Sequence, residues 1–81
     1  LICLPTFLHA AAATEAFGSG KHVYLEKPLA QNTKEAAIVI EAWRKSGKAG
    51  MAGLNLRFNP IYASLKSKID AGMAGEINSV R

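Results

Sequence analysis

Short apolar runs alternate along the chain with stretches in which apolar residues recur at helical spacing. Continuous apolar runs predict strands at residues 1–4 and 22–25, of the kind that is covered on both faces in a parallel sheet. A third strand is predicted at residues 49–54, where two glycines weaken the β-propensity. Helical spacing from about residue 8 to residue 17 predicts a helix between the first two strands.

Two further helices are predicted from their start and stop signals. Asn32 has the chemistry of an N-cap, and Glu35 stands three residues later, where it completes a capping box. Gly47 follows this helix at the position where a left-handed residue commonly ends one. Asn59 followed by Pro60 predicts the start of the last helix, because proline suits the first helical position.

Each of these two helices carries an apolar stripe that we expect to be buried. On the last helix the stripe recurs every four residues, at Ile61, Leu65 and Ile69, with Tyr62 beside it. Glu41 and Lys45 stand four residues apart, outside the stripe of the preceding helix, and favour an ion pair. The expected buried face of that preceding helix consists of Ala36, Ala37, Val39, Ile40 and Trp43.

The order of elements is therefore strand–helix–strand–helix–strand–helix, and residues 76–81 predict the opening of a fourth strand. Strands that alternate with helices predict an α/β fold with a parallel sheet and right-handed crossovers. The chain starts and ends in predicted strands, so we interpret it as a segment of a longer polypeptide.

Composition narrows the classes of function. The 81 residues allow one small domain at most, and the apolar fraction of 49% is typical of globular proteins. The net charge is +4, but the basic residues are spread along the chain and suit a solvated surface better than a nucleic-acid interface. No apolar run approaches the length that crosses a bilayer, and no basic segment precedes the first apolar run as in a signal peptide.

Cysteine and histidine usage gives little sign of metal chemistry. Cys3 is the single cysteine, which excludes an internal disulfide; we expect it to be buried and the protein to be cytoplasmic. His9 near the start of the first helix has no second histidine four residues later, so we expect no metal site. A packed or surface role is the ordinary interpretation of such a histidine.

The glycines do not form a phosphate-binding loop. Residues 18–21 read Gly-Ser-Gly-Lys, but this segment runs from a helix to a strand, whereas a phosphate loop runs from a strand to a helix. The dinucleotide fingerprint G-x-G-x-x-G is also absent. If the sheet binds a nucleotide, we expect the pyrophosphate loop to precede residue 1.

Candidate chemistry lies where the second strand ends, at Glu26-Lys27-Pro28. In open α/β sheets ligands bind at the carboxyl ends of the strands, and this triplet places an amine and a carboxylate there. X–Pro bonds are the usual site of cis peptides, so we expect one at Lys27–Pro28. Arg57 follows the third strand, where a functional role and a surface role are both plausible.

Taken together, these pieces resemble the glucose–fructose oxidoreductase/inositol dehydrogenase (Gfo/Idh/MocA) family of NAD(P)-dependent oxidoreductases. The likeness covers nearly the whole chain, and its most specific part is G-K-H-V-Y-L-E-K-P-L-A at residues 20–30. Residues 4–9, 53–60 and 69–77 also match. The local departure is Ala49-Gly50, where the family usually has bulkier strand residues.

The resemblance implies the C-terminal half of a Rossmann-type parallel sheet in residues 1–75, and the first strand of a following α+β domain in residues 76–81. It implies NAD or NADP as cofactor and a sugar or polyol as substrate. Lys27 would be catalytic, since its ammonium can stabilise negative charge on the substrate oxygen during hydride transfer. The residues implied to bind the cofactor are Pro5, Thr6, His9, Glu26, Lys27, Asn55 and Arg57.

Two other functions remain open from the sequence. The parent protein could be a non-catalytic sensor or scaffold with the same fold, or this segment could be a self-associating module. The strand predicted at residues 1–4 would have an unpaired edge, and such edges seek partners, so we expect a homo-oligomer. The segment alone is expected to be inactive, because the glycine loop and the proton-transferring residue of the family are not in it.

Overall fold

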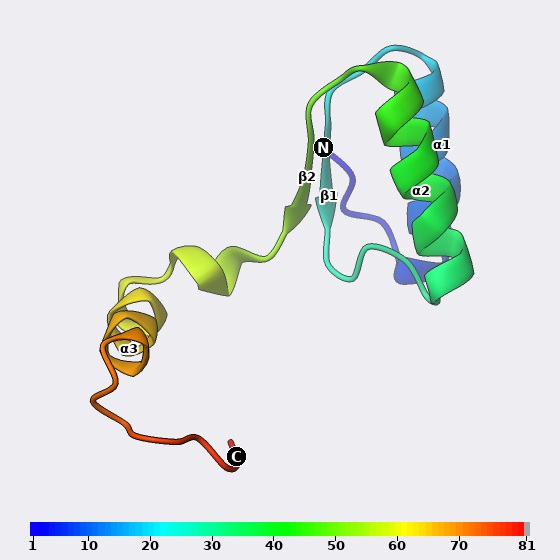
Figure 1. The fold of residues 1–81 in the computed structure, drawn as a ribbon. Helices are drawn as coiled ribbons and strands as arrows, with labels where there is room; N and C mark the ends of the chain where they lie inside the picture. Colours follow the sequence, from blue (N-terminus) through cyan, green and yellow to red (C-terminus); the bar gives the residue numbers. More distant parts are fainter. Residues whose placement is uncertain (81) are drawn as a thin grey trace.

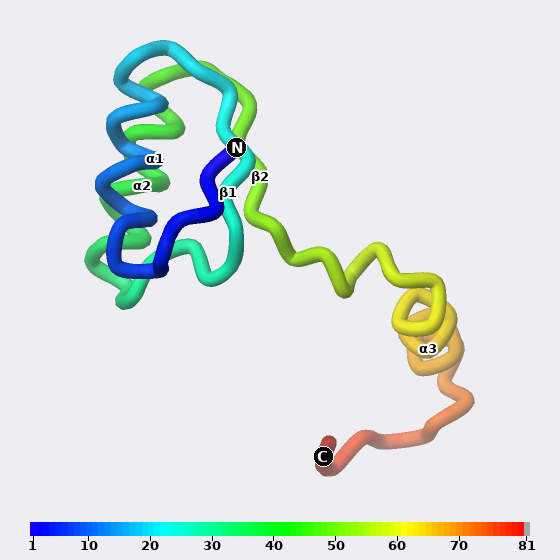
Figure 2. The backbone as a smooth tube through the Cα atoms, turned by 180° about the vertical axis from the view of Figure 1, so that it is seen from behind, coloured from blue at the N-terminus to red at the C-terminus, as the bar shows by residue number. Residues whose placement is uncertain are grey.

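The structure is a computed structural model that describes residues 1–80. An α/β unit of two helices and a small sheet continues into an arm that carries the last helix (Figure 1). Both α1 and α2 lie on the same face of the sheet, and the view from behind agrees (Figure 2). The elements are η1 (Thr6–Leu8), α1 (His9–Gly18), β1 (Val23–Glu26), α2 (Thr33–Ser46), β2 (Gly50–Gly53), η2 (Asn55–Phe58) and α3 (Pro60–Asp70).

The strands run parallel, as the alternation of elements predicts. β1 pairs with β2 so that Val23 lies opposite Gly50 and Glu26 lies opposite Gly53. On the other side of β1, Ile2 forms a single parallel bridge with Leu25. The first segment, β1 and β2 therefore lie in this order with their carboxyl ends at one edge, which confirms the partial Rossmann-type arrangement.

The strand predicted at residues 1–4 is wrong in its extent and its burial. Only Ile2 bridges to the sheet, since the chain turns away at Pro5 into η1. Leu1 is 87% exposed and Leu4 46% exposed, because no further element covers this edge among residues 1–80. Cys3 is exposed as well, contrary to the expectation that it is buried.

The core lies between the sheet and the two helices that cover it. Along β1, Val23 and Leu25 face the helices. The alternate residues, Tyr24 and Glu26, face the opposite side and are half-buried. The alanines of α1 let this helix approach α2 and the sheet closely. The buried apolar residues are Ala13, Phe17, Val23, Leu25 and Val39.

The ends of α2 follow their predicted chemistry with one difference. The Asn32 side chain accepts the Glu35 N–H at 2.9 Å, which confirms the N-cap. The Glu35 carboxylate accepts the backbone N–H of Gln31 at 3.1 Å, so the return bond is made one residue earlier than in the standard capping box. Gly47 ends the helix in the left-handed conformation, with φ of 64°.

The buried face predicted for α2 is narrower than expected. Within the predicted set only Val39 is buried, and Ile40 and Trp43 are 37% and 41% exposed. The reason is that two strands and one bridge cover a narrower strip of the helix than a complete sheet would. The indole N–H of Trp43 nevertheless has a partner, since it donates to the carbonyl of Lys48 at 2.8 Å.

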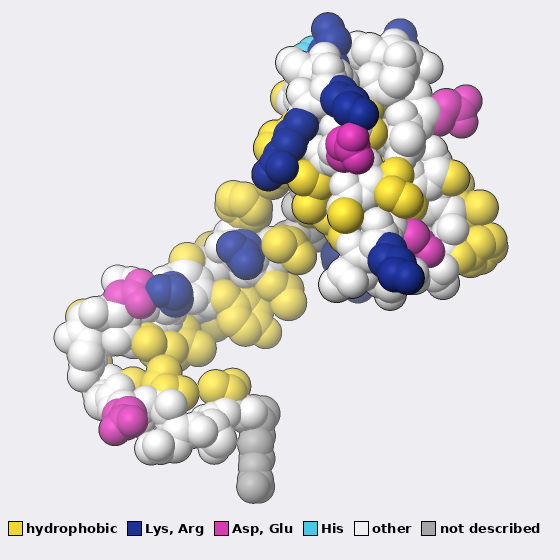
Figure 3. All heavy atoms as spheres, turned by 45° about the vertical axis from the view of Figure 1, so that its right-hand side comes forward, with side chains coloured by type: hydrophobic (Ala, Val, Ile, Leu, Met, Phe, Trp, Pro, Cys, Tyr) yellow, Lys and Arg dark blue, Asp and Glu magenta, His cyan; other side chains and the backbone are white. Residues whose placement is uncertain are grey.

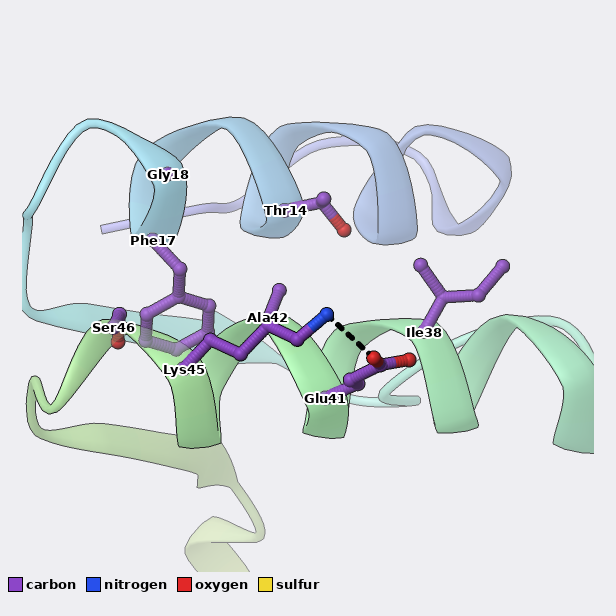
Figure 4. Close-up of a pocket in the computed structure, with 8 residues that line it drawn as sticks. All are labelled: Thr14, Phe17, Gly18, Ile38, Glu41, Ala42, Lys45 and Ser46. Atoms are coloured by element: carbon purple, nitrogen blue, oxygen red, sulfur yellow. Dashed lines mark ion pairs between the residues drawn. The ribbon is translucent and has the colours of Figure 1, made fainter.

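A hollow lies between α1 and α2, away from the sheet (Figure 4). Beside it, Lys45 and Glu41 form the predicted ion pair, with 2.6 Å between nitrogen and oxygen. The hydrogen bond and the positive charge of Lys45 hold the pKa of the Glu41 carboxyl below its ordinary value. None of the residues that line this hollow belongs to the loops at the carboxyl ends of β1 and β2, and the charges of Lys45 and Glu41 offset one another.

The arm contains α3, which starts as predicted. The Asn59 side chain accepts the N–H of Ile61 at 2.9 Å, and Pro60 is the first helical residue. Most of the apolar stripe predicted to be buried is exposed instead, with Ile61 at 75% and Leu65 at 53% exposure, whereas Ile69 is half-buried. The reason is that α3 lies mainly against η2. Hydrophobic side chains are accordingly visible on the surface of the arm (Figure 3).

The predicted fourth strand is not formed in residues 76–80, which have no neighbouring strand to pair with; Arg81 lies outside the described residues. The assignment of residues 76–81 to a following domain stays a prediction. Among the helices of residues 1–80, none combines the length and the apolar character that spanning a membrane requires.

Candidate functional site

Three loops lie at the carboxyl edge of the sheet. They follow the bridged segment at Ile2, the end of β1 at Glu26, and the end of β2 at Gly53. The Glu26 N–H bonds to the Ile2 carbonyl at 3.0 Å, so the first two segments end at the same level. This edge is where open α/β sheets bind ligands.

A pocket of about 480 Å³ opens between the loops that follow β1 and β2. It brings together three of the predicted site residues, Lys27, Asn55 and Arg57, whose side chains are all exposed. Lysine and arginine side chains are donors only, and the asparagine amide can donate as well. Within residues 1–80 no carboxylate lines this pocket. Leu54 and Leu56 supply apolar walls, so the arrangement suits a partly apolar ligand that carries acceptor oxygens.

The loop after β1 is fixed by its own residues. The Lys27–Pro28 peptide is cis, as predicted. The Glu26 carboxylate accepts the backbone N–H of Lys27 at 3.1 Å. No ion pair joins this carboxylate to the Lys27 ammonium in the described part of the chain. Glu26 therefore orders the backbone of the loop and does not pair with the Lys27 ammonium in the described residues.

His9 connects the first loop to the second. The ring is 1% exposed; Nδ1 lies 2.7 Å from the Pro28 carbonyl oxygen and Nε2 lies 2.8 Å from that of Leu4. With both nitrogens directed at backbone oxygens, neither is free for a ligand in this structure. The sequence could not show this, because the two carbonyl groups come from segments 24 residues apart.

Pro5 and Thr6 lie on the first loop and do not line the pocket with Lys27. The Pro5 carbonyl accepts the N–H of Leu8 at 2.9 Å, which closes the turn of η1. The predicted site residues thus divide into two groups along one edge. Lys27, Asn55 and Arg57 share a pocket, whereas Pro5 and Thr6 lie on the loop that His9 ties to Pro28.

One site residue was missed from the sequence. The hydroxyl of Tyr24 donates to Oδ1 of Asn55 at 2.6 Å, and so joins β1 to η2. The available signal was the alternation along β1, which directs residue 24 away from the helices and toward the open face of the sheet. In residues 1–80, no three His, Cys, Asp or Glu side chains lie together in a group that could hold a metal ion.

Comparisons with known proteins identify the family of this fold. A family described as "Oxidoreductase family, NAD-binding Rossmann fold" matches residues 1–54. The scyllo-inositol 2-dehydrogenase (NAD(+)) of Bacillus subtilis is 34% identical over 94% of this chain, and a 4-carboxy-2-hydroxymuconate-6-semialdehyde dehydrogenase of Sphingobium is 38% identical over 89% of it. The chain spans only 22% and 23% of the lengths of these relatives.

Solved structures give the same result. The WlbA dehydrogenase of Bordetella pertussis, in complex with NADH and UDP-GlcNAcA, superposes with a TM-score of 0.86 at 28% identity, over 94% of this chain and 22% of that one. The myo-inositol 2-dehydrogenase of Lactobacillus plantarum gives 0.84 at 26% identity, over 94% and 23%. Since the family match covers more than half of the residues, this chain belongs to the glucose–fructose oxidoreductase/inositol dehydrogenase family of oxidoreductases with an NAD-binding Rossmann fold.

Proposed function

We propose that the protein containing this chain is an NAD(P)-dependent oxidoreductase that transfers hydride between the nicotinamide and a sugar, polyol or similar hydroxyl or carbonyl compound. The observation that carries the proposal is the pocket in which Lys27, Asn55 and Arg57 meet at the carboxyl edge of parallel strands. Relatives named for inositol and levoglucosan support the substrate class. The chain spans about a fifth of these relatives, so this activity belongs to the whole protein.

The residues present fit the nicotinamide end of such a cofactor. Lys27, Asn55 and Arg57 offer donors to carboxamide, ribose and substrate oxygens, and the pocket of about 480 Å³ has room for a ring. When bound, the nicotinamide supplies the chemistry of accepting or donating a hydride. The chain contains no G-x-G-x-x-G sequence, so residues outside it would hold the pyrophosphate. The 81 residues alone would therefore lack turnover.

Lys27 is the residue that we propose to act on the substrate. Hydride would leave a carbinol carbon for the nicotinamide, the hydroxyl proton would pass to a base outside this chain, and negative charge would develop on the oxygen. An ammonium within hydrogen-bonding distance stabilises that charge. The ordered backbone of the loop supports this role, because Glu26 binds the Lys27 N–H and leaves the amine without a carboxylate partner in residues 1–80.

The test compares variants of the full parent protein with a panel of polyols and sugars, following NAD(P)H absorbance. Lys27→Ala should lower kcat/KM by about 10²–10³-fold, the usual cost of losing one donor to a developing oxyanion. Lys34→Ala is the matched control, because Lys34 is exposed on α2 and lies outside the pocket. Equal activity of Lys27→Ala and wild type would remove Lys27 from the mechanism. No turnover by the wild type with any compound would overturn the proposed function.

A further inference from the structure

We propose that Tyr24 is a positioning residue that fixes the Asn55 side chain as a hydrogen-bond donor in the ligand pocket. The proposal rests on the function proposed above, because it concerns the same pocket. Tyr24 itself does not line the pocket, whereas Asn55 does. Its effect on a ligand would therefore pass through the asparagine.

The first support is the geometry of the bond. Tyr24 is the second residue of β1 and projects from the face of the sheet opposite α1 and α2. Asn55 is the first residue of η2, directly after the loop that leaves β2. Their side chains are 31 positions apart in sequence, yet 2.6 Å separates the tyrosine hydroxyl from Oδ1. This is the one side-chain hydrogen bond between β1 and the third loop in the described residues.

The second support comes from Gly53, the last residue of β2. A Cβ placed there would lie 3.0 Å from the Tyr24 hydroxyl oxygen and 3.3 Å from two ring carbons. The backbone of Gly53 is not in the left-handed region, so its conformation does not require a glycine. The glycine instead provides space: the tyrosine ring lies directly against the backbone of β2 on its way to Asn55.

The chemical consequence concerns the direction of the amide. An asparagine has one acceptor oxygen and one NH₂ group with two donors. With Oδ1 engaged by Tyr24, the group that remains for a ligand is the NH₂. The pocket then offers donors from Lys27, Asn55 and Arg57, and favours ligand groups that accept hydrogen bonds, such as carbonyl, carboxamide or carboxylate oxygens. Without the hydroxyl, the amide could turn its oxygen toward the ligand.

The experiment uses the full parent protein and removes only the hydroxyl, as Tyr24→Phe. Tyr62→Phe is the matched control, because Tyr62 lies on α3 and outside this pocket. We expect Tyr24→Phe to raise the NAD(P)H dissociation constant or the substrate KM by about 3–10-fold, as for loss of one hydrogen bond, with a smaller change in kcat. Tyr62→Phe should leave all three unchanged.

A double-mutant cycle separates positioning from a general structural role. In an Asn55→Ala background, Tyr24→Phe should have no further effect on binding, because the amide that it orients is gone. Gly53→Ala should weaken binding in the same direction as Tyr24→Phe, since it crowds the hydroxyl. The proposal would be overturned if Tyr24→Phe weakened binding equally in the wild-type and the Asn55→Ala backgrounds. It would also be overturned if Tyr24→Phe alone did not weaken binding.

A readout that does not depend on activity keeps the two proposals distinguishable. In the parent protein labelled with ¹⁵N at asparagine, the Asn55 side-chain amide signals are identified by their loss in Asn55→Ala. They should shift in Tyr24→Phe and stay in place in Tyr62→Phe. A parent protein without NAD(P)H binding or turnover would overturn the proposed function, whereas Asn55 signals unmoved in Tyr24→Phe would overturn the positioning role.

Discussion

Replacing Gly50 by alanine tests whether the close contact of β2 with the helices is as tight as the structure shows. A Cβ at this position would lie 3.0 Å from Cζ of Phe17, 3.0 Å from Cδ1 of Trp43 and 3.2 Å from its Nε1. Phe17 is 4% exposed, and the indole N–H of Trp43 is bonded to the Lys48 carbonyl. One of these side chains, or the strand, must shift.

The expected change in the free energy of unfolding follows from two opposing contributions. Overpacking a close-packed site costs about 1–3 kcal/mol. Alanine also reduces the freedom of the unfolded chain relative to glycine, which returns about 0.4–1 kcal/mol. The difference between the two terms is about 0–2.6 kcal/mol, so we expect Gly50→Ala to lower the free energy of unfolding by about 1 kcal/mol.

The assay is urea unfolding followed by the fluorescence of Trp43, the only tryptophan in the chain. Gly18→Ala at the end of α1 is the matched control, because a Cβ there meets nothing within 4 Å and the backbone is not left-handed. This control should be neutral or more stable by about 0.4–1 kcal/mol. If Gly50→Ala gains stability by as much as Gly18→Ala, the contact with Phe17 and Trp43 is looser than the structure shows and the reasoning fails.

Two further predictions concern the ends and the surface of α2. Asn32→Ala removes the side-chain acceptor of the Glu35 N–H and should lower the free energy of unfolding, measured in urea, by about 1 kcal/mol. The control Asn78→Ala, outside any helix or strand, should leave the free energy of unfolding unchanged. Lys45→Gln should raise the pKa of Glu41 toward its ordinary value of 4.5, measured by NMR titration at low and high salt. Because the folded pKa is lowered, the stability from this pair is fully present above 4.5 and is lost as the pH falls through the folded pKa. A Glu41 pKa that is the same in Lys45→Gln and wild type would contradict the ion pair.

The features that the sequence predicts well are those whose chemistry lies within a few consecutive residues. Asn32, Gly47 and Asn59 cap helices through bonds to residues two to four positions away or through their own backbone conformation, so local sequence is sufficient. The parallel order of the strands also follows from the alternation of elements. The three donors of the pocket were predictable because each follows a strand in a parallel sheet.

The features that sequence reasoning missed depend on contacts between distant segments. The exposure of Trp43 depends on how much of the sheet lies opposite α2, which the pattern within the helix does not contain. The two bonds of His9 and the bond of Tyr24 to Asn55 need the positions of separate loops. A histidine or tyrosine alone in the sequence gives no indication of such partners.

The two glycines of β2 also determine how this strand aligns with β1. Gly50 lies opposite Val23 on the side of the helices, whereas Gly53 lies opposite Glu26 on the other side, against Tyr24. Sliding β2 by one residue in either direction would put a side chain into both narrow spaces at once, so only the observed register avoids steric conflict. Because Glu26 lies opposite Gly53, the loop that begins at Lys27 leaves the sheet beside the loop that begins at Leu54. Two residues with no side chain thereby set how the loops that carry Lys27 and Asn55 align.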